Sequence, residues 1–177
     1  MSFLGRLGEG CWTLGFIEGG LQQIMDTNTP KVNWVSVPKD RWFADPFILD
    51  VNDTEILVLV DDYEYNLEKG VISLLHINRK TMEIISRKVL LELSIHLSFP
   101  NIYRRNDEIY VYPESARSGK LDIYRFDAIA EELHPCATIC DDSIWDSDIS
   151  EHFGEPFLFT AAHNDYHLDI YKWSEDC

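Results

Sequence analysis

The stretch NIYRRNDEIYVYPESARSGKLDIYRF, residues 101–126, aligns without a gap with DISEHFGEPFLFTAAHNDYHLDIYKW, residues 148–173. The match pairs Ile102 with Ile149 and repeats the tetrapeptide Leu-Asp-Ile-Tyr, always 47 positions apart. A period of about 40–50 residues built from β-type segments is typical of a β-propeller blade. Chance similarity between two β-hairpins is the alternative explanation. The repeat is favoured because the match runs over two strands and the turn between them.

Residues 45–62 align with the same repeat when one extra residue is allowed. Pro46 then aligns with Pro100 and Glu55 with Glu108. A closed propeller needs at least four blades, so we expect an incomplete propeller with about three to four blades in this chain. An open β edge leaves backbone groups unpaired, which favours self-association or pairing with missing blades. The expected single domain covers 1–177, with blades over about 45–92, 99–140 and 146–177 and extra strands in 1–44.

The fold class predicted from the whole chain is all-β. Short segments rich in β-branched and aromatic residues alternate with turn signals such as Asn-Asp and Ser-Gly, and no long helical pattern separates them. The predicted strands cover residues 13–17, 34–37, 46–49, 55–60, 71–77, 83–90, 101–104, 109–112, 121–126, 137–139, 156–160 and 167–173.

The composition excludes some classes of partner. The 177 residues include 31 acidic and 15 basic side chains, which gives a formal net charge of -16. Nucleic acids and anionic membranes are polyanions that need a basic surface, so neither is expected as a partner. The charge permits neutral sugars or a cation. No apolar run reaches the 18 residues needed to span a bilayer.

We expect a cytoplasmic protein without a cofactor or a bound metal. The N-terminal residues MSFLGRLGEGCW contain no continuous apolar segment of a signal peptide. The four cysteines have no framework spacing, and reduced thiols fit best. His163 and His167, and likewise the group His134, Cys136 and Cys140, resemble metal ligands only superficially, because zinc pairs need a closer spacing or a helix.

Six segments resemble a known family. They are WTLGFIEG (12–19), RWFADPFIL (41–49), EKGVIS (68–73), HLSFPNIY (96–103), YPES (112–115) and LDIYRF (121–126). In this order they resemble the propeller domain at the N-terminus of glucosamine inositolphosphorylceramide transferase and its bacterial relatives. That domain in turn resembles the five-bladed glycoside hydrolases of family 43. The resemblance implies a five-bladed type of propeller with a sugar-related role, often beside glycosyltransferases in glycan assembly.

Carboxylates at equivalent repeat positions form the candidate catalytic group. Asp45, Phe99 and Asp146 are equivalent, so Asp45 and Asp146 are expected to converge near the axis. Glycoside hydrolysis uses two such carboxyl groups, one as acid and one as base or nucleophile. The resemblance implies Asp45 as the general base and Asp146 as an auxiliary aspartate, with Asp142 and Asp148 as competing residues for the auxiliary position.

The hydrolases take their general acid, a glutamate, from a fourth blade that this chain lacks. Glu114, which is equivalent to Asp61 in blade one, is the candidate replacement. The favoured alternative is that Glu114 and Asp61 bond backbone donors or contact sugar hydroxyls. Asp45 also fits a purely structural turn, and Asp146 also fits a polar loop.

The expected ligand-binding residues lie beside these carboxylates. His96, just before Ser98, either bonds a sugar hydroxyl or pins its loop to a neighbouring blade. Trp42, like Trp12 and Trp34, has a ring suited to stacking on a sugar, although core filling is the favoured role for at least two of the three.

Three functions remain open from the sequence. The favoured one is a carbohydrate-associated module that binds or processes a glycan during polysaccharide or glycolipid assembly. The second is an inverting glycoside hydrolase with Asp45 as base. The third is a non-catalytic scaffold that recruits a partner protein through its open β edge.

Overall fold

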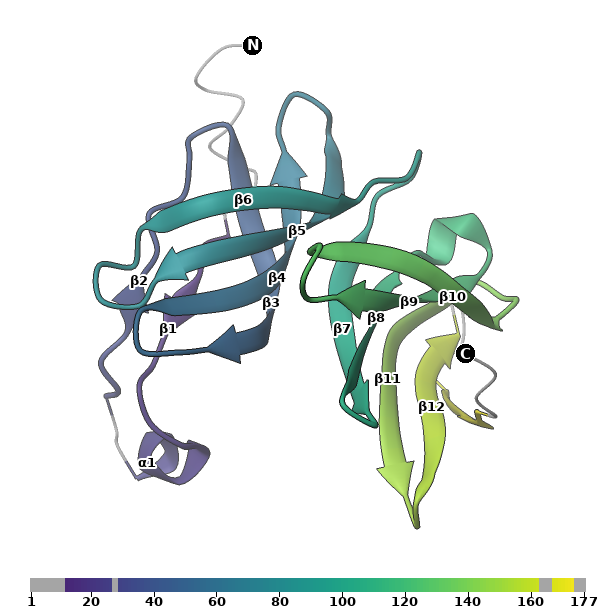
Figure 1. Ribbon diagram of the computed structural model, residues 1–177. Coiled ribbons are helices and arrows are strands. Elements are labelled where there is room, and N and C mark those ends of the chain that lie inside the picture. Colours follow the sequence, from purple (N-terminus) through teal and green to yellow (C-terminus); the bar gives the residue numbers. More distant parts are fainter. Residues whose placement is uncertain (1–11, 27–28, 163–166, 174–177) are drawn as a thin grey trace.

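The protein is described as a computed structural model over residues 12–26, 29–162 and 167–173. Within these residues the chain forms antiparallel sheets, and the all-β prediction is confirmed. Two four-stranded sheets and one three-stranded sheet follow one another along the chain, as consecutive propeller blades do. Figure 1 shows them side by side, with the first sheet on the left of the view. No helix in the described residues is long and apolar enough to cross a membrane.

Each sheet is a simple meander, so strand order in space equals order in sequence. Blade one comprises β3 (Arg41–Val51), β4 (Glu55–Glu64), β5 (Lys69–Asn78) and β6 (Ile84–Leu91). Blade two comprises β7 (Ser98–Arg105), β8 (Glu108–Glu114), β9 (Leu121–Asp127) and β10 (Glu132–Cys140), with the 3-10 turn η2 (Ala116–Ser118) before β9. Blade three comprises β11 (Ile144–His152), β12 (Glu155–Ala162) and β13 (Leu168–Lys172).

A small N-terminal unit covers the outer flank of blade one. It contains β1 (Gly15–Phe16) and β2 (Asn33–Trp34), which pair with each other, and the short helix α1 (Leu21–Met25) between them. Leu14 and Val35 from this unit are buried against Val58, Val60 and other residues of blade one. The unit therefore occupies the flank on which another blade of a closed ring would pack.

The apolar cores lie between neighbouring sheets. Leu59, Ile72 and Leu74 of blade one pack with Leu97 and Val111 at blade two. A further core joins blades two and three, and its buried members are Tyr103, Tyr112, Leu121, Ile123, Ile144, Ile149 and Leu158.

The strands β4 and β5 are apolar on both faces because each face has a partner. One face meets the N-terminal unit, and the other meets blade two. Their sequences, EILVLVDDYE and KGVISLLHIN, therefore read as nearly continuous apolar runs rather than as an alternation. Two aspartates, Asp61 and Asp62, end the run in β4, and both are buried.

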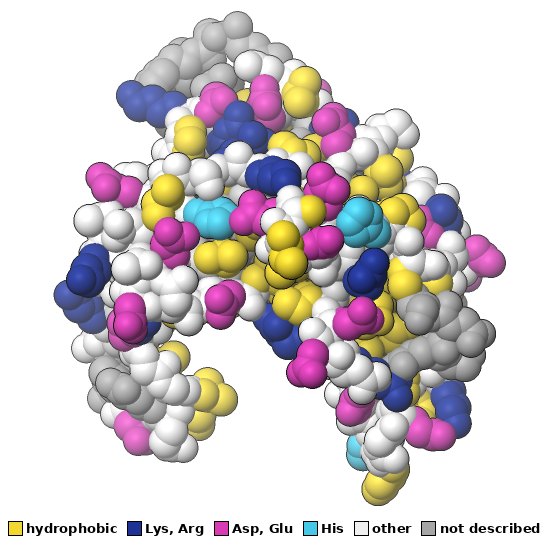
Figure 2. All heavy atoms as spheres, viewed as in Figure 1, with side chains coloured by type: hydrophobic (Ala, Val, Ile, Leu, Met, Phe, Trp, Pro, Cys, Tyr) yellow, Lys and Arg dark blue, Asp and Glu magenta, His cyan; other side chains and the backbone are white. Residues whose placement is uncertain are grey.

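The first strands of the three sheets lie next to one another. The strand β7 contacts both β3 and β11. In the space-filling view, a hollow opens at the lower centre, below blade one and between the N-terminal unit and blade three (Figure 2). Residues far apart in sequence therefore meet where β3, β7 and β11 approach one another.

Some details differ from the expectations. Trp12 and Trp34 are each 63% exposed, so the expected core-filling role is wrong for both. Cys136 is disulfide-bonded, and the expectation of reduced thiols is wrong at this residue, whereas Cys140 is free. The candidate metal ligand His163 lies outside the described residues, as do Cys11 and Cys177.

Candidate functional site

The three equivalent repeat positions share an unusual backbone conformation. Asp45, Phe99 and Asp146 have φ angles of 48°, 46° and 49°, in the left-handed region that residues other than glycine rarely adopt. Each lies at a shift in the register between the first and second strands of its blade. A β-bulge of this kind bends the strand and redirects a side chain. The repeat therefore places the same bulge at the same end of all three blades, and we call this end the mouth.

Carboxylates join each bulge to the next along the mouth. The backbone N–H of Phe99 donates to Oδ2 of Asp45 over 3.3 Å, from blade two to blade one. The N–H of Asp146 donates to Oε2 of Glu114 over 3.0 Å, from blade three to blade two. The hydroxyl of Ser98 donates to Oε1 of Glu114 over 3.3 Å. Asp45, Glu114, Asp146 and Ser98 are thus brought together by the fold.

Asp61 lies behind this row, on β4. It is paired across the sheet with Ala44, as Glu114 is paired with Ser98, so Asp61 and Glu114 are structurally equivalent. Asp61 is only 2% exposed, and its Oδ1 has no hydrogen-bond partner among the residues that the structure describes. A sugar outside the fold therefore has almost no access to this carboxyl group, in contrast to the expectation that Asp61 contacts a sugar hydroxyl.

Burial and like charges change the acidity of two mouth carboxyls. Burial, with the nearby charges of Asp45, Asp62 and Glu114, raises the pKa of Asp61 to about 8. Burial also raises the pKa of Glu114, and the charges of Asp146 and Asp45 add to this. The bonds from the Asp146 N–H and from Ser98 oppose the rise. At neutral pH Asp61 is therefore an un-ionised acid behind the mouth.

His96 pins the loop that enters blade two. Its Nδ1 accepts a 2.8 Å hydrogen bond from the N–H of Gly70, and the N–H of Leu97 donates to the Gly70 carbonyl over 3.1 Å. Of the two roles expected for His96, the structure therefore shows the loop-pinning one. A Cβ on Gly70 would lie 2.3 Å from Oδ1 of Asp61 and 2.6 Å from both the His96 ring and the Leu97 carbonyl oxygen, so only glycine fits.

A small pocket of about 80 Å³ opens at the mouth. His96, Ser98 and Glu114 line it, together with Arg117 of η2 and Trp145 of β11. The last two were missed by sequence reasoning. Trp145 occupies the repeat position of Ser98 and Ala44, and this equivalence is the signal that identifies it. For Arg117, which follows the YPES segment after one alanine, the repeat gives no comparable signal.

A larger pocket of about 280 Å³ lies between the outer strands β10 and β13. It has no carboxylate in its lining and contains none of the residues expected at the site. Its larger volume alone does not indicate a function, so the mouth remains the candidate site.

Aromatic rings border the mouth on blade one. Trp42 stacks on Tyr63 with ring centroids 4.7 Å apart and an interplanar angle of 1°. Tyr63 in turn meets His96 edge to face at 5.9 Å. Trp42 is half-buried, and its ring stacks within blade one beside the mouth.

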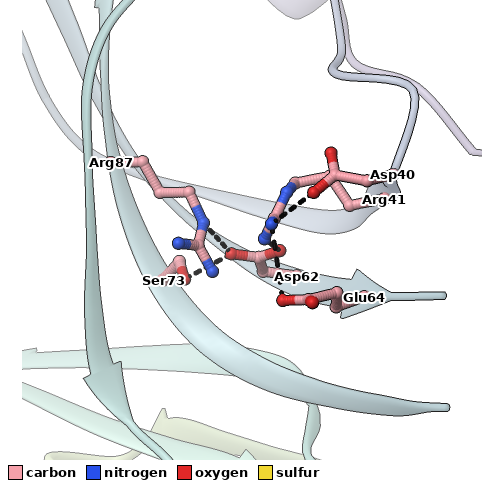
Figure 3. Close-up of polar contacts among 6 residues, drawn as sticks. All are labelled: Asp40, Arg41, Asp62, Glu64, Ser73 and Arg87. Carbon is pink, nitrogen blue, oxygen red and sulfur yellow. Dashed lines mark hydrogen bonds and ion pairs between the residues drawn. The ribbon is translucent and has the colours of Figure 1, made fainter. Parts of the chain in front are cut away.

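Asp62 shows how a buried aspartate is stabilised when it has partners (Figure 3). Its side chain points to the opposite face of β4 from Asp61 and is fully buried. It accepts hydrogen bonds from Nη1 of Arg41 over 3.1 Å, from the hydroxyl of Ser73 over 2.6 Å and from Nε of Arg87. This network crosses all four strands of blade one and does not involve the mouth.

Comparison with known proteins identifies the family. The sequence model described as "Glucosamine inositolphosphorylceramide transferase 1, N-terminal" matches residues 29–172. Glucosamine inositolphosphorylceramide transferase 1 from Arabidopsis thaliana is 28% identical over 127 residues, which cover 71% of this chain and 16% of the plant protein. The chain thus spans a small part of this relative.

A solved structure shows the same fold. The exo-β-1,3-galactanase of Phanerochaete chrysosporium, solved with β-1,3-galactotriose, matches with a TM-score of 0.60 and 13% identity. The match covers 81% of this chain and 40% of the galactanase chain. The galactanase is a family 43 glycoside hydrolase with a β-propeller. The chain therefore belongs to the family of the N-terminal domain of glucosamine inositolphosphorylceramide transferase 1, and its fold is that of a β-propeller.

Proposed function

We propose that this chain is a carbohydrate-associated propeller module that binds a glycan at its mouth, in the assembly of a polysaccharide or glycolipid. The observation that carries the proposal is the convergence of Asp45, Glu114 and Asp146 from three blades. Carboxylates accept hydrogen bonds from sugar hydroxyls, and hydrogen bonds to charged groups are stronger than neutral ones. Family membership supports a glycan-related role.

The test is binding to an array of neutral, acidic and amino-sugar oligosaccharides, followed by calorimetry. β-1,3-Galactotriose, the saccharide in the galactanase structure, is the first probe. Asp45→Asn and Glu114→Gln are each expected to weaken binding by about tenfold or more, because a charged hydrogen-bond acceptor is lost. Asp50→Asn is the matched control, since Asp50 is exposed on the same strand as Asp45. Equal affinity in all three variants contradicts a site at the mouth.

A second candidate function, inverting glycoside hydrolysis, is favoured by one specific observation. Glu114 lines the pocket and has a raised pKa, as a general acid requires, while Asp45 on the neighbouring blade would serve as the base. Asp45→Ala would then abolish turnover of aryl glycosides without unfolding the chain. A wild-type protein that binds saccharides but turns over no glycoside would contradict hydrolysis, and binding would remain as the proposed function.

The remaining expectations stay predictions. Self-association is supported by the outer face of blade three, where Leu168 is 66% and Ile170 57% exposed on the last strand described. The cytoplasmic location also stays a prediction. The disulfide at Cys136 does not favour it, since disulfides persist mainly in oxidising compartments.

A further inference from the structure

Asp61 is surrounded by groups that do not stabilise a negative charge. Asp45 on β3 and Glu114 on β8 are acidic, and so is Asp62 on its own strand. A basic residue, His96, lies nearby, with its Nε2 3.7 Å from Oδ2 of Asp61, beyond hydrogen-bonding distance. The other oxygen, Oδ1, faces Gly70 and accepts no hydrogen bond from the described part of the chain.

The tautomer of His96 is set by Gly70. Because the Gly70 N–H donates to Nδ1, the ring proton of the neutral imidazole lies on Nε2, on the side of Asp61. Burial lowers the pKa of His96, and the charge of Arg117 adds to this, while the charge of Asp45 opposes it. At neutral pH, His96 is therefore uncharged and does not offset a charge on Asp61.

The adjacent residue, Asp62, shows that burial on this strand does not by itself leave an aspartate without cationic partners. Asp62 is equally buried on the same strand, but it has two guanidinium groups and a hydroxyl as partners. Asp61 has none of these, although a buried carboxyl oxygen without a partner lowers stability. Departures of this kind from the rules of stable packing concentrate at functional sites.

We propose that Asp61 is a positioning residue of the mouth. As an uncharged acid packed against Gly70 and His96, it would hold the loop before Ser98 and add no charge beside Asp45 and Glu114. This inference rests on the proposed function for its effect on binding. Ionisation of Asp61 would add a buried negative charge beside Asp45 and Glu114, which repel it. Saccharide binding therefore weakens as the pH rises through about 8.

The first test needs no ligand. In the whole protein labelled with carbon-13 at the aspartate carboxyls, the Asp61 signal, assigned by its loss in Asp61→Asn, titrates near pH 8. Asp45→Asn lowers this midpoint, because a like charge is removed. An Asp61 carboxyl that titrates near pH 4, or a midpoint unmoved by Asp45→Asn, overturns the proposal.

The second test measures saccharide binding against pH, with β-1,3-galactotriose or the strongest binder of the array. The wild-type association constant falls by about tenfold between pH 7 and pH 9, the size of effect that one pKa unit represents. In Asp61→Asn the ratio of the two constants approaches one. A variant that keeps the wild-type ratio, or that binds at neither pH, overturns the proposal. If the wild type binds no saccharide, the proposed function fails, while the carboxyl titration still decides the charge state of Asp61.

Discussion

Replacement of Asp62 by asparagine is expected to lower the free energy of unfolding by about 3 kcal/mol. The carboxylate bridges Arg41, Ser73 and Arg87 inside blade one, and Arg41 is itself largely buried. Removal of one partner from a buried ion pair typically costs about 3–5 kcal/mol, because the other charge stays buried without compensation. The partial exposure of Arg87 favours the lower end of that range. Urea unfolding at neutral pH, followed by tryptophan fluorescence, measures the change.

The control is Asp40→Asn. Asp40 also pairs with Arg41, over 2.9 Å, but its side chain is 51% exposed. Exposed ion pairs contribute at most about 1 kcal/mol, so the loss of this pair is expected to be small. Equal destabilisation by the two substitutions would show that burial of Asp62 does not determine its contribution.

Asp61→Asn is expected to have the opposite effect, with a gain in stability that grows with pH. The pKa of Asp61 is about 8 in the folded protein, compared with about 3.9 in an unfolded chain. Between these values the folded state retains a proton that the unfolded state has lost. The wild-type stability therefore falls as the pH rises, by up to about 1.4 kcal/mol per pH unit from this group. Asparagine does not titrate, so the variant lacks this loss.

The measurement is the difference in unfolding free energy between wild type and Asp61→Asn at pH 5, 6 and 7. The difference is expected to increase steadily over this range and to level off above pH 8. Asp50→Asn, an exposed site on β3, gives the background. Parallel curves for wild type and Asp61→Asn would mean that Asp61 is ionised in both the folded and the unfolded state, which contradicts a raised pKa in the folded protein.

Much of the fold and of the site follows from the internal repeat. The alignment made Asp45, Phe99 and Asp146 equivalent, and all three have the same left-handed bulge. It also made Asp61 equivalent to Glu114, and the strand register agrees. Equivalent positions can be predicted from the sequence because a bulge at the same point of each blade fixes the spacing of the residues around it.

Other features depend on contacts that the local sequence does not record. The strand β11 was not among the predicted strands, because its segment IWDSDISEH is polar and its bulge interrupts the alternation of buried residues. Trp12 and Trp34 are exposed although large aromatic residues usually fill cores. The difference between Asp61 and Asp62 was also not readable, since it depends on the arginines that reach only one face of β4.

The most direct test of a saccharide site at the mouth follows backbone amide signals by NMR during saccharide addition. The amides of Phe99 and Asp146 donate to the carboxylates of Asp45 and Glu114, so they report on those groups. These two amides, together with that of Gly70, are expected to shift first and furthest. Shifts confined to the outer pocket between β10 and β13, with the Phe99 and Asp146 amides unmoved, would contradict a saccharide site at the mouth.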